Sequence, residues 1–350
     1  MKKYSTIAVL KLPNCRINAF GIMQIADMMT NIGCLRDLNL DMNPNTQENF
    51  HLLCSPLGNL WYLSLKLCEI SDDGMMKITN ELRYQDPPNN PKLIILNLAN
   101  NHITKNGAAR IGCMLRSNRS LKSLVLLGNR ICDEGASLII RELKIITLTH
   151  EEIMDLRRRK FAQLALQEKL ESEEISKTID EELSTKRNGK SRSRQSLNKR
   201  SRKSRDSLIK TLEGGSILQD LESRKEILLV SESHPFRNES FPINDSIMAT
   251  GNLELQHLDL GYNYLTIGTL KKLIGCLRYQ NYMLLGDSTK GILHCFLENG
   301  NIEKKGNEDW STYEELLRMR QDGNTFANDT FREFMSEEIE ILRKNVKLIC

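Results

Sequence analysis

Leucines recur along this chain at strand spacing, and an asparagine, an isoleucine and a glycine follow them at fixed distances. In the segment 93–107, LIILNLANNHITKNG, Leu93, Leu96 and Leu98 alternate with outward positions, as in a short strand with one buried face. Asn101 follows three residues after the last leucine, and the final glycine opens an apolar segment with helical spacing. The pattern therefore predicts one strand, one turn and one helix.

The same pattern returns along the chain, which makes it an internal repeat rather than a single motif. The copies begin at Ile7, Leu35, Leu60, Leu93, Leu121 and Leu255. The second half of the copy at Leu35 is irregular, from Pro44 to Pro56, and in the copy at Leu255 the glycine, Gly268, comes one residue early. Because one repeat cannot bury its own apolar face, we expect each copy to stack on its neighbours.

The asparagine after each strand has a predicted structural role. Its amide can bond backbone groups of its own turn and of the neighbouring turn, which would otherwise be buried and unpaired. Cys15 and Cys68 take this position in two copies, as a small and weakly hydrogen-bonding substitute. The glycine eases the tight start of the helix, where a Cβ would be costly.

These repeats resemble the leucine-rich repeats of the ribonuclease-inhibitor subfamily, over roughly residues 7–143 and 253–280. The resemblance implies a curved α/β horseshoe, with parallel β-strands on the concave side and α-helices on the convex side. We therefore expect the fold class α/β: a leucine-rich-repeat horseshoe interrupted by a helical and disordered basic insert.

Five segments are expected along the chain. They are leucine-rich repeats at 1–145, a charged helix of the insert at 146–185, a basic and largely disordered insert with its re-entry segment at 186–250, returning leucine-rich repeats at 251–300, and a C-terminal helical cap at 301–350. The charged helix is predicted from the capping box Thr149-x-x-Glu152. The first strand lacks the polar cap that solenoids carry, so we expect further chain before it or another surface that covers it.

The repeat pattern weakens after Leu277. We expect a last strand at Asn281–Gly286, and helices at Trp310–Met319 and Thr330–Leu348 that close the last repeat, or that bind a partner as the alternative. The segment Ile292–Asn301 fits no single element and stays unassigned.

Positive charge is concentrated in residues 186–205, KRNGKSRSRQSLNKRSRKSR, where ten of twenty residues are Lys or Arg and none is acidic. This composition predicts a disordered polybasic linker. It is suited to a polyanion such as RNA, DNA, an acidic membrane surface or tubulin tails; a nuclear-localisation signal and a merely solvated linker are the alternatives. The candidate polyanion-binding residues are Arg192, Arg194, Lys199, Arg200, Arg202, Lys203 and Arg205.

The chain contains no nucleotide-binding, zinc-protease or serine-hydrolase motif. Its nine cysteines form no C-x-x-C pair, so we expect buried, reduced thiols in an intracellular protein, with Cys113 and Cys276 on apolar helix faces. No run of about 18 apolar residues predicts a membrane span. The expectation is a cytoplasmic, non-enzymatic protein without a cofactor, a metal or a small-molecule substrate.

The remaining candidate is the concave surface, formed by positions between and just after the strand leucines. Val125 and Leu127 are apolar there, beside the small Ala99 and Gly261, and exposed apolar side chains on such a sheet mark a protein contact. Alternatively, the insert or the segment 236–243 covers them. The candidate partner-binding residues are Trp61, Tyr62, Lys66, Asn97, Val125, Leu127 and Asp259.

The horseshoe with a long charged insert, and the re-entry sequences SHPFRNESFPIND and GNLELQHLDLGYN, also resembles a leucine-rich-repeat family of ciliated animals. That resemblance implies a structural role in the axoneme of motile cilia or sperm flagella, with axonemal or tubulin-associated protein partners. The first hypothesis is thus a non-catalytic protein-interaction scaffold. The alternatives are a nucleic-acid- or chromatin-associated protein recruited through the polybasic insert, and an inhibitor that grips an enzyme in its concavity.

Overall fold

The computed structural model describes most of the repeat region and part of the insert. The described residues are 7–86, 89–188, 234–243, 246–284, 287–298, 302, 304 and 306–323. The chain divides into two compact units: unit 1 comprises residues 1–148 and 239–350, and unit 2 comprises residues 149–238.

Unit 1 is built on a parallel seven-stranded sheet in the order β1-β2-β3-β4-β5-β9-β10. The strands are β1 (Val9–Lys11), β2 (Asp37–Asn39), β3 (Tyr62–Ser64), β4 (Ile95–Asn97), β5 (Ser123–Val125), β9 (His257–Asp259) and β10 (His294–Phe296). The middle residue of each points toward the core, and Leu38, Leu63 and Leu96 are fully buried. Six of these strands stand where the repeated pattern predicts them.

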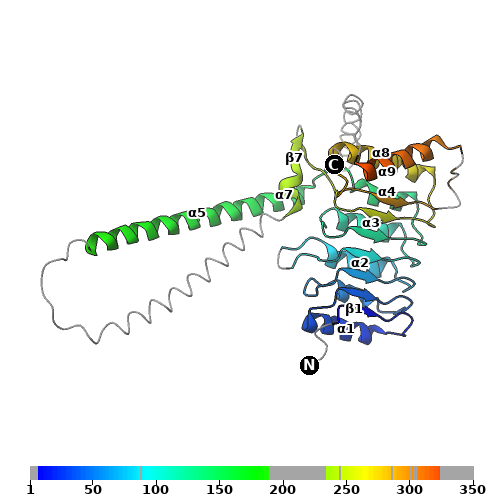
Figure 1. The fold of residues 1–350 in the computed structure, drawn as a ribbon, viewed down its shortest axis with the longest axis horizontal. Helices are drawn as coiled ribbons and strands as arrows, with labels where there is room; N and C mark the ends of the chain where they lie inside the picture. The colour runs from blue at the N-terminus through cyan, green and yellow to red at the C-terminus, as the bar shows by residue number, and fades with distance from the viewer. Residues whose placement is uncertain are drawn as a thin grey trace. The chain divides into compact units, whose positions relative to one another are not determined.

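Helices follow the strands and stack in chain order on the other side of the core (Figure 1). They are α1 (Ala19–Ile32), α2 (Asp72–Leu82), α3 (Lys105–Leu115), α4 (Asp133–Arg141) and α8 (Ile267–Leu284). The irregular second repeat has instead a 3-10 helix, η2 (Asn49–Cys54), which buries Phe50 and Leu53. Repeated strands and helices around one apolar core confirm the predicted α/β leucine-rich-repeat fold.

A ladder of buried asparagines joins consecutive repeats, as predicted. The Asn101 carbonyl oxygen accepts hydrogen bonds from the backbone N–H groups of Cys68 (3.1 Å) and Ile70 (3.0 Å). Its amide nitrogen donates to the carbonyls of Leu65 (3.0 Å) and Leu98 (2.9 Å). Asn43, Asn129 and Asn263 also bridge two repeats.

A second ladder fixes the N-termini of the helices. The N-cap residue Thr104 of α3 donates through its backbone N–H (2.8 Å) and its hydroxyl (2.5 Å) to Asp72, which lies in the first turn of α2. Thr266, just before α8, donates in the same way to Asp133 of α4, at 2.9 and 2.6 Å. Each acid therefore ties the helix of its own repeat to that of the next.

The sheet continues directly across the insert. Ser123, Leu124 and Val125 of β5 pair in parallel register with His257, Leu258 and Asp259 of β9. The prediction that the returning copy stacks on the copy at Leu121 is confirmed.

The chain segments that flank the insert form a small antiparallel sheet in unit 1. It has the order β6-β8-β7, from β6 (Ile146–Thr147), β7 (Ser240–Ile243) and β8 (Ser246–Ala249). Ile146 and Ser240 both pair with Ala249, from opposite sides. Part of the segment that we expected to be largely disordered or extended is thus a hairpin, and residues 146–147 are a strand rather than the start of the helix.

Unit 2 contains α5 (His150–Asn188). The predicted capping box is present at its start: the Thr149 N–H donates to Glu152 Oε2 (2.8 Å) and the Glu152 N–H donates to Thr149 Oγ1 (3.3 Å). The short α7 (Pro235–Glu239) precedes β7. The predicted polyanion-binding residues, between 192 and 205, lie outside the described residues.

The end of the repeat region differs from the prediction. Residues 281–284 are not a strand, because α8 continues through Leu284, and the Asn281 amide donates to the Leu316 carbonyl of α9. Residues 285–286 of the predicted strand lie outside the described residues. In the described part of the chain, the last strand is β10. The helix α9 (Glu308–Asp322) contains the predicted helix Trp310–Met319 and buries Trp310, Tyr313 and Leu316. The predicted helix at 330–348 lies outside the described residues.

Candidate protein-interaction surface

Three rows of outward-facing positions cross the parallel sheet. The first row is Val9, Asp37, Tyr62, Ile95, Ser123, His257 and His294, and the second is Lys11, Asn39, Ser64, Asn97, Val125, Asp259 and Phe296. Backbone hydrogen bonds just beyond the strands define the third row, which is Asp41, Lys66, Ala99, Leu127, Gly261 and Glu298. Since strand side chains alternate, these positions face away from the leucine core.

The structure brings six of the seven predicted site residues onto these rows. Asn97, Val125 and Asp259 are neighbours in the second row, while Tyr62 lies in the first row and Lys66 and Leu127 lie in the third.

Trp61 is the exception, because it stands just before β3. Its N–H donates to the Arg36 carbonyl (2.8 Å), and its ring centre lies 5.1 Å from the Arg36 guanidinium carbon. Half of Trp61 is exposed, so it belongs to the edge where the strands begin.

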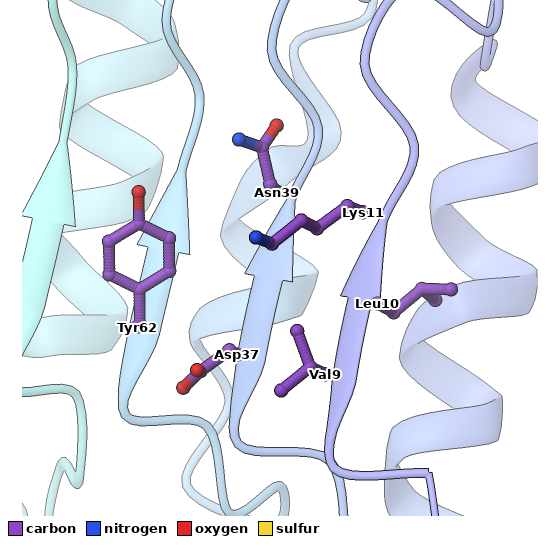
Figure 2. A pocket seen from close by; sticks show the side chains of 6 residues that line it. All are labelled: Val9, Leu10, Lys11, Asp37, Asn39 and Tyr62. Atoms are coloured by element: carbon purple, nitrogen blue, oxygen red, sulfur yellow. The ribbon is translucent and has the colours of Figure 1, made fainter.

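The N-terminal end of the concave face is polar and slightly hollowed (Figure 2). Val9, Lys11, Asp37, Asn39 and Tyr62 line a hollow of about 220 Å³ over β1, β2 and β3, with Lys11 extended over β2. This volume is below the roughly 300 Å³ at which small-molecule sites begin. The hollow is therefore better suited to one side chain of a partner than to a cofactor.

Hydrogen bonds within the chain already occupy several polar groups at this end. Asp41 Oδ1 accepts from Ser64 Oγ (2.6 Å) and from the Lys66 N–H (2.9 Å), and Asp41 Oδ2 accepts from the Asn39 amide (3.0 Å). Ser64 is consequently buried, although we expected it to face the open concavity. These residues stabilise the surface and have less capacity left for a ligand.

The C-terminal end is apolar and aromatic, and we name it the C-terminal patch: Val125, Leu127, His257, Asp259 and Phe296. Phe296 is 46% exposed, and its ring centre lies 5.5 Å from that of His257. Val125 and Leu127 are half-buried rather than fully exposed. The patch thus presents an apolar surface next to a carboxylate.

Small residues flank Leu127 and explain its partial burial. Ala99 and Gly261, its neighbours in the third row, are both buried. A Cβ built on Gly261 would lie 3.1 Å from Leu127 Cδ1, so the leucine side chain leans over the glycine. We had expected Ala99 to be exposed, but the strands around it leave it 3% accessible.

Burial shifts the pKa of both titratable groups in the patch. It lowers the pKa of His257, against the opposing charge of Asp259, and His257 Nδ1 lies 2.9 Å from Ser123 Oγ. Burial raises the pKa of Asp259, and the nearby Glu298 acts in the same direction, against a hydrogen bond from the Gly261 N–H at 2.9 Å. The imidazole is therefore held toward its neutral form.

Sequence reasoning missed the contribution of β10 and the residues just after it to this surface, which is His294, Phe296 and Glu298. The signal was present, because Ile292-x-x-Cys295-x-Leu297 repeats the strand pattern with cysteine in a leucine position. The side chains of Ile292, Cys295 and Leu297 are all buried.

Within the described parts of the chain, no cluster of three or more His, Cys, Asp or Glu side chains could hold a metal ion. The eight cysteines described there are free, and burial raises the pKa of Cys68 to about 11. The expectation of buried thiols is confirmed for Cys54, Cys68, Cys276 and Cys295, and it is wrong for Cys15 and Cys113, which are exposed. Of the helices that the structure describes, none has the length and apolar character needed to cross a membrane.

Stacked strand–helix units with an outward-facing concave sheet define a solenoid protein that presents a binding surface. A family model described as "Leucine Rich repeat" matches residues 59–78, 89–112 and 117–139, which carry β3 to β5. The match and the stacked strands and helices together show a leucine-rich-repeat fold. Such repeats are typically non-catalytic binding scaffolds. No curated protein is significantly similar to the chain.

Proposed function

We propose that this protein is a non-catalytic scaffold that binds a protein partner with the concave face of its leucine-rich repeats. The observation that carries the proposal is the C-terminal patch. Phe296 stands 46% exposed beside half-buried Val125 and Leu127, and contiguous apolar groups on an otherwise polar surface favour a protein contact.

The rest of the face supports a macromolecular partner rather than a small molecule. The hollow at Lys11 and Asp37 is small, and the polar groups around Asp41 are bonded to one another. A partner that spans several strands would contact the patch and the hollow together, with the patch as its energetic centre. Interfaces of proteins concentrate their binding energy in a few central apolar or aromatic anchors of this kind.

We further propose that the repeats are of the ribonuclease-inhibitor type, and that the protein is a fixed part of the axoneme of motile cilia or sperm flagella. A helix of 11 residues in both α2 and α3 supports the repeat type. The arrangement of repeats around a long charged insert supports the ciliary role. The protein would then act in the cytoplasm and its ciliary extension, with axonemal or tubulin-associated partners.

A second candidate function is binding to nucleic acid or chromatin through the polybasic segment at 186–205. Its support is composition alone, with ten Lys or Arg residues in twenty and no acid. Such a segment binds polyanions in a strongly salt-dependent way. In the first hypothesis it adds to partner binding without being necessary for it.

Proximity labelling in a ciliated cell tests the proposal. The labelled proteins of the intact chain are compared with those of Val125→Asp/Leu127→Asp and of a deletion of residues 186–205. Phe20→Asp/Met23→Asp is the matched control, because it places the same charges on exposed apolar positions of α1. Phe296→Asp, at a largely exposed position, serves as a second variant if the first unfolds, as judged by circular dichroism.

The scaffold hypothesis predicts that axonemal proteins dominate and that only the concave variants lose them. The deletion should weaken this labelling without abolishing it. Ribonucleoproteins or chromatin proteins that are lost on deletion, with no effect of the concave variants, would instead support the second candidate.

A further inference from the structure

We propose that the C-terminal patch recognises a partner segment in which an aliphatic or aromatic side chain stands next to a lysine or arginine. This inference rests on the proposed function, and it adds the chemistry of the partner. It follows from how the strand register places apolar and acidic groups side by side.

The strand register places an acidic residue close to an apolar one in two of the rows. In the second row Asp259 lies between Val125 and Phe296, and in the third row Leu127 is followed by Gly261 and Glu298. Neighbouring strands lie about 4.8 Å apart, so each carboxylate stands within roughly 5–10 Å of an apolar side chain.

The carboxylate of Asp259 has no cation opposite it in the part of the chain that the structure describes. It accepts one backbone hydrogen bond, from the Gly261 N–H. Glu298 has Lys304 as an ion-pair partner, but at 3.7 Å and with both side chains about half exposed, which makes the pair weak. A cation from a partner would therefore meet two carboxylates whose charge is mostly uncompensated.

His257 supplies little of that compensation, because its pKa is lowered and the imidazole is held toward its neutral form. Burial lowers the pKa of His257, and the His294 ring lies 6.5 Å away, where its charge would lower it further. Burial and Glu298 together raise the pKa of Asp259. A lysine or arginine of a partner near Asp259 would lower that pKa, because an opposite charge favours the ionised carboxylate.

An acidic partner segment fits this end poorly, since it would add negative charge beside Asp259 and Glu298. The lysines of the concave face lie elsewhere: Lys11 extends over β2, and Lys66 follows β3. The patch thus selects for the sign of charge as well as for apolar area, and electrostatic complementarity of this kind mainly sets specificity.

The spacing defines the motif. An apolar and a basic side chain about 5–7 Å apart correspond to positions i and i+3 or i+4 on a helix, or to i and i+2 on a strand. A segment with several basic residues but no apolar side chain leaves Val125 and Phe296 uncovered, and an apolar segment without a base leaves Asp259 unpaired.

The test uses the full chain, immobilised and screened against a random peptide library displayed on phage. Enriched peptides should combine Leu, Ile, Phe or Trp with Lys or Arg at these spacings. Asp259→Asn/Glu298→Gln should lower the affinity of a selected peptide at least tenfold and remove the preference for a basic residue. Asp37→Asn, at the other end of the concave face, is the control and should bind as the wild type does.

Other outcomes overturn the inference in distinguishable ways. Enrichment of purely apolar or acidic peptides, or no enrichment at all, refutes the proposed chemistry. If apolar peptides bind the wild type and Asp259→Asn/Glu298→Gln equally but fail to bind Val125→Asp/Leu127→Asp, the concave scaffold stands and only this inference fails. If basic peptides bind Val125→Asp/Leu127→Asp as well as the wild type, the patch is not the site and the concave proposal fails with it.

Discussion

At the scale of single residues, asparagine completes the backbone hydrogen bonding between repeats. Asn101 is 3% exposed; it accepts from two N–H groups of the preceding repeat and donates to carbonyls of both repeats that it joins. Cysteine reproduces part of this role, since Cys68 Sγ donates to the Leu40 carbonyl at 3.3 Å. A side chain with both donor and acceptor is thus needed where the chain leaves each strand.

Replacement of Asn101 by alanine should lower the free energy of unfolding by about 3 kcal/mol, because it leaves several buried backbone groups unpaired. Urea denaturation followed by circular dichroism measures the loss. The control is Asn106→Ala, at an exposed position of α3, which should change stability by less than about 0.5 kcal/mol. Equal stability of the two variants would contradict the structural role of Asn101.

The acid ladder makes stability depend on pH. Burial acts to raise the pKa of Asp133, but hydrogen bonds from Thr266 and Thr269 outweigh it and leave the pKa below its ordinary value of 3.8. A carboxylate whose pKa is lowered by folding contributes stability above its unfolded-state pKa and loses it as the pH falls through the folded-state pKa.

The stability advantage of the wild type over Asp133→Asn should therefore be complete at neutral pH and disappear below pH 3.8. Thermal melts at several pH values measure it. An advantage that stays constant into acid would show that the charge of Asp133 is not what Thr266 and Thr269 stabilise.

Residue patterns predicted the core well and the surface less well. The leucines, the asparagines and the strands they define follow from spacing alone, because every repeat must bury the same positions. His294 and Phe296 were missed because Cys295 takes a leucine position in their strand, although Ile292 and Leu297 keep the rest of the pattern. The burial of Ala99 and Ser64 depends on neighbouring strands and on Asp41, which no single repeat shows.

At the scale of elements, a clamp holds the chain where it re-enters unit 1 after the insert. The Arg119 guanidinium donates to both carboxylate oxygens of Glu239, at 3.0 Å to Oε1 and 2.6 Å to Oε2, and to the carbonyls of Leu115 and Gly251. Asn252 then donates to the Leu115 carbonyl. The re-entering chain is thus fixed to the loop that follows α3 before β9 joins the sheet.

The clamp should show a coupling free energy of about 1–3 kcal/mol in a double-mutant cycle of Arg119→Ala and Glu239→Gln. Both side chains are mostly buried, at 15% and 28% exposure, so solvent screens the pair only in part. Chemical denaturation of the four proteins gives the coupling. Additive effects of the two substitutions would show that the ion pair is incidental.

The positions of β6 and β7 make the insert removable. Ile146 and Ser240 both pair with Ala249 of β8, so these two residues, which flank the insert, lie about 10 Å apart across it. Replacement of residues 150–233 by a flexible linker of about eight residues can span that distance.

We expect this deletion variant to keep the stability of unit 1 or to raise it by about 1–2 kcal/mol, because a shorter loop costs less entropy to close. Urea unfolding of the variant measures this. A loss of cooperative unfolding would show that the repeats on either side depend on the insert.

At the scale of the whole molecule, the concave face has two chemically different ends. The N-terminal end is a polar surface whose groups bond one another, and the C-terminal end combines Val125, Leu127 and Phe296 with Asp259 and Glu298. The sequence predicted a concave binding face and two of its apolar residues, Val125 and Leu127. The aromatic and acidic contribution of Phe296 and Glu298 was missed, because the strand pattern at Ile292 has cysteine in a leucine position.

The measurement that tests the central claim most directly is site-specific photo-crosslinking in a ciliated cell. Benzoylphenylalanine is introduced at Phe296 on the concave sheet, and at the exposed Arg110 of α3 on the convex side as the control. If the concave face binds the partner, position 296 should give a defined crosslinked species that Val125→Asp/Leu127→Asp removes, and position 110 should give none. Crosslinks from position 110 alone, or species at 296 that the double substitution leaves unchanged, would contradict the concave face as the binding surface.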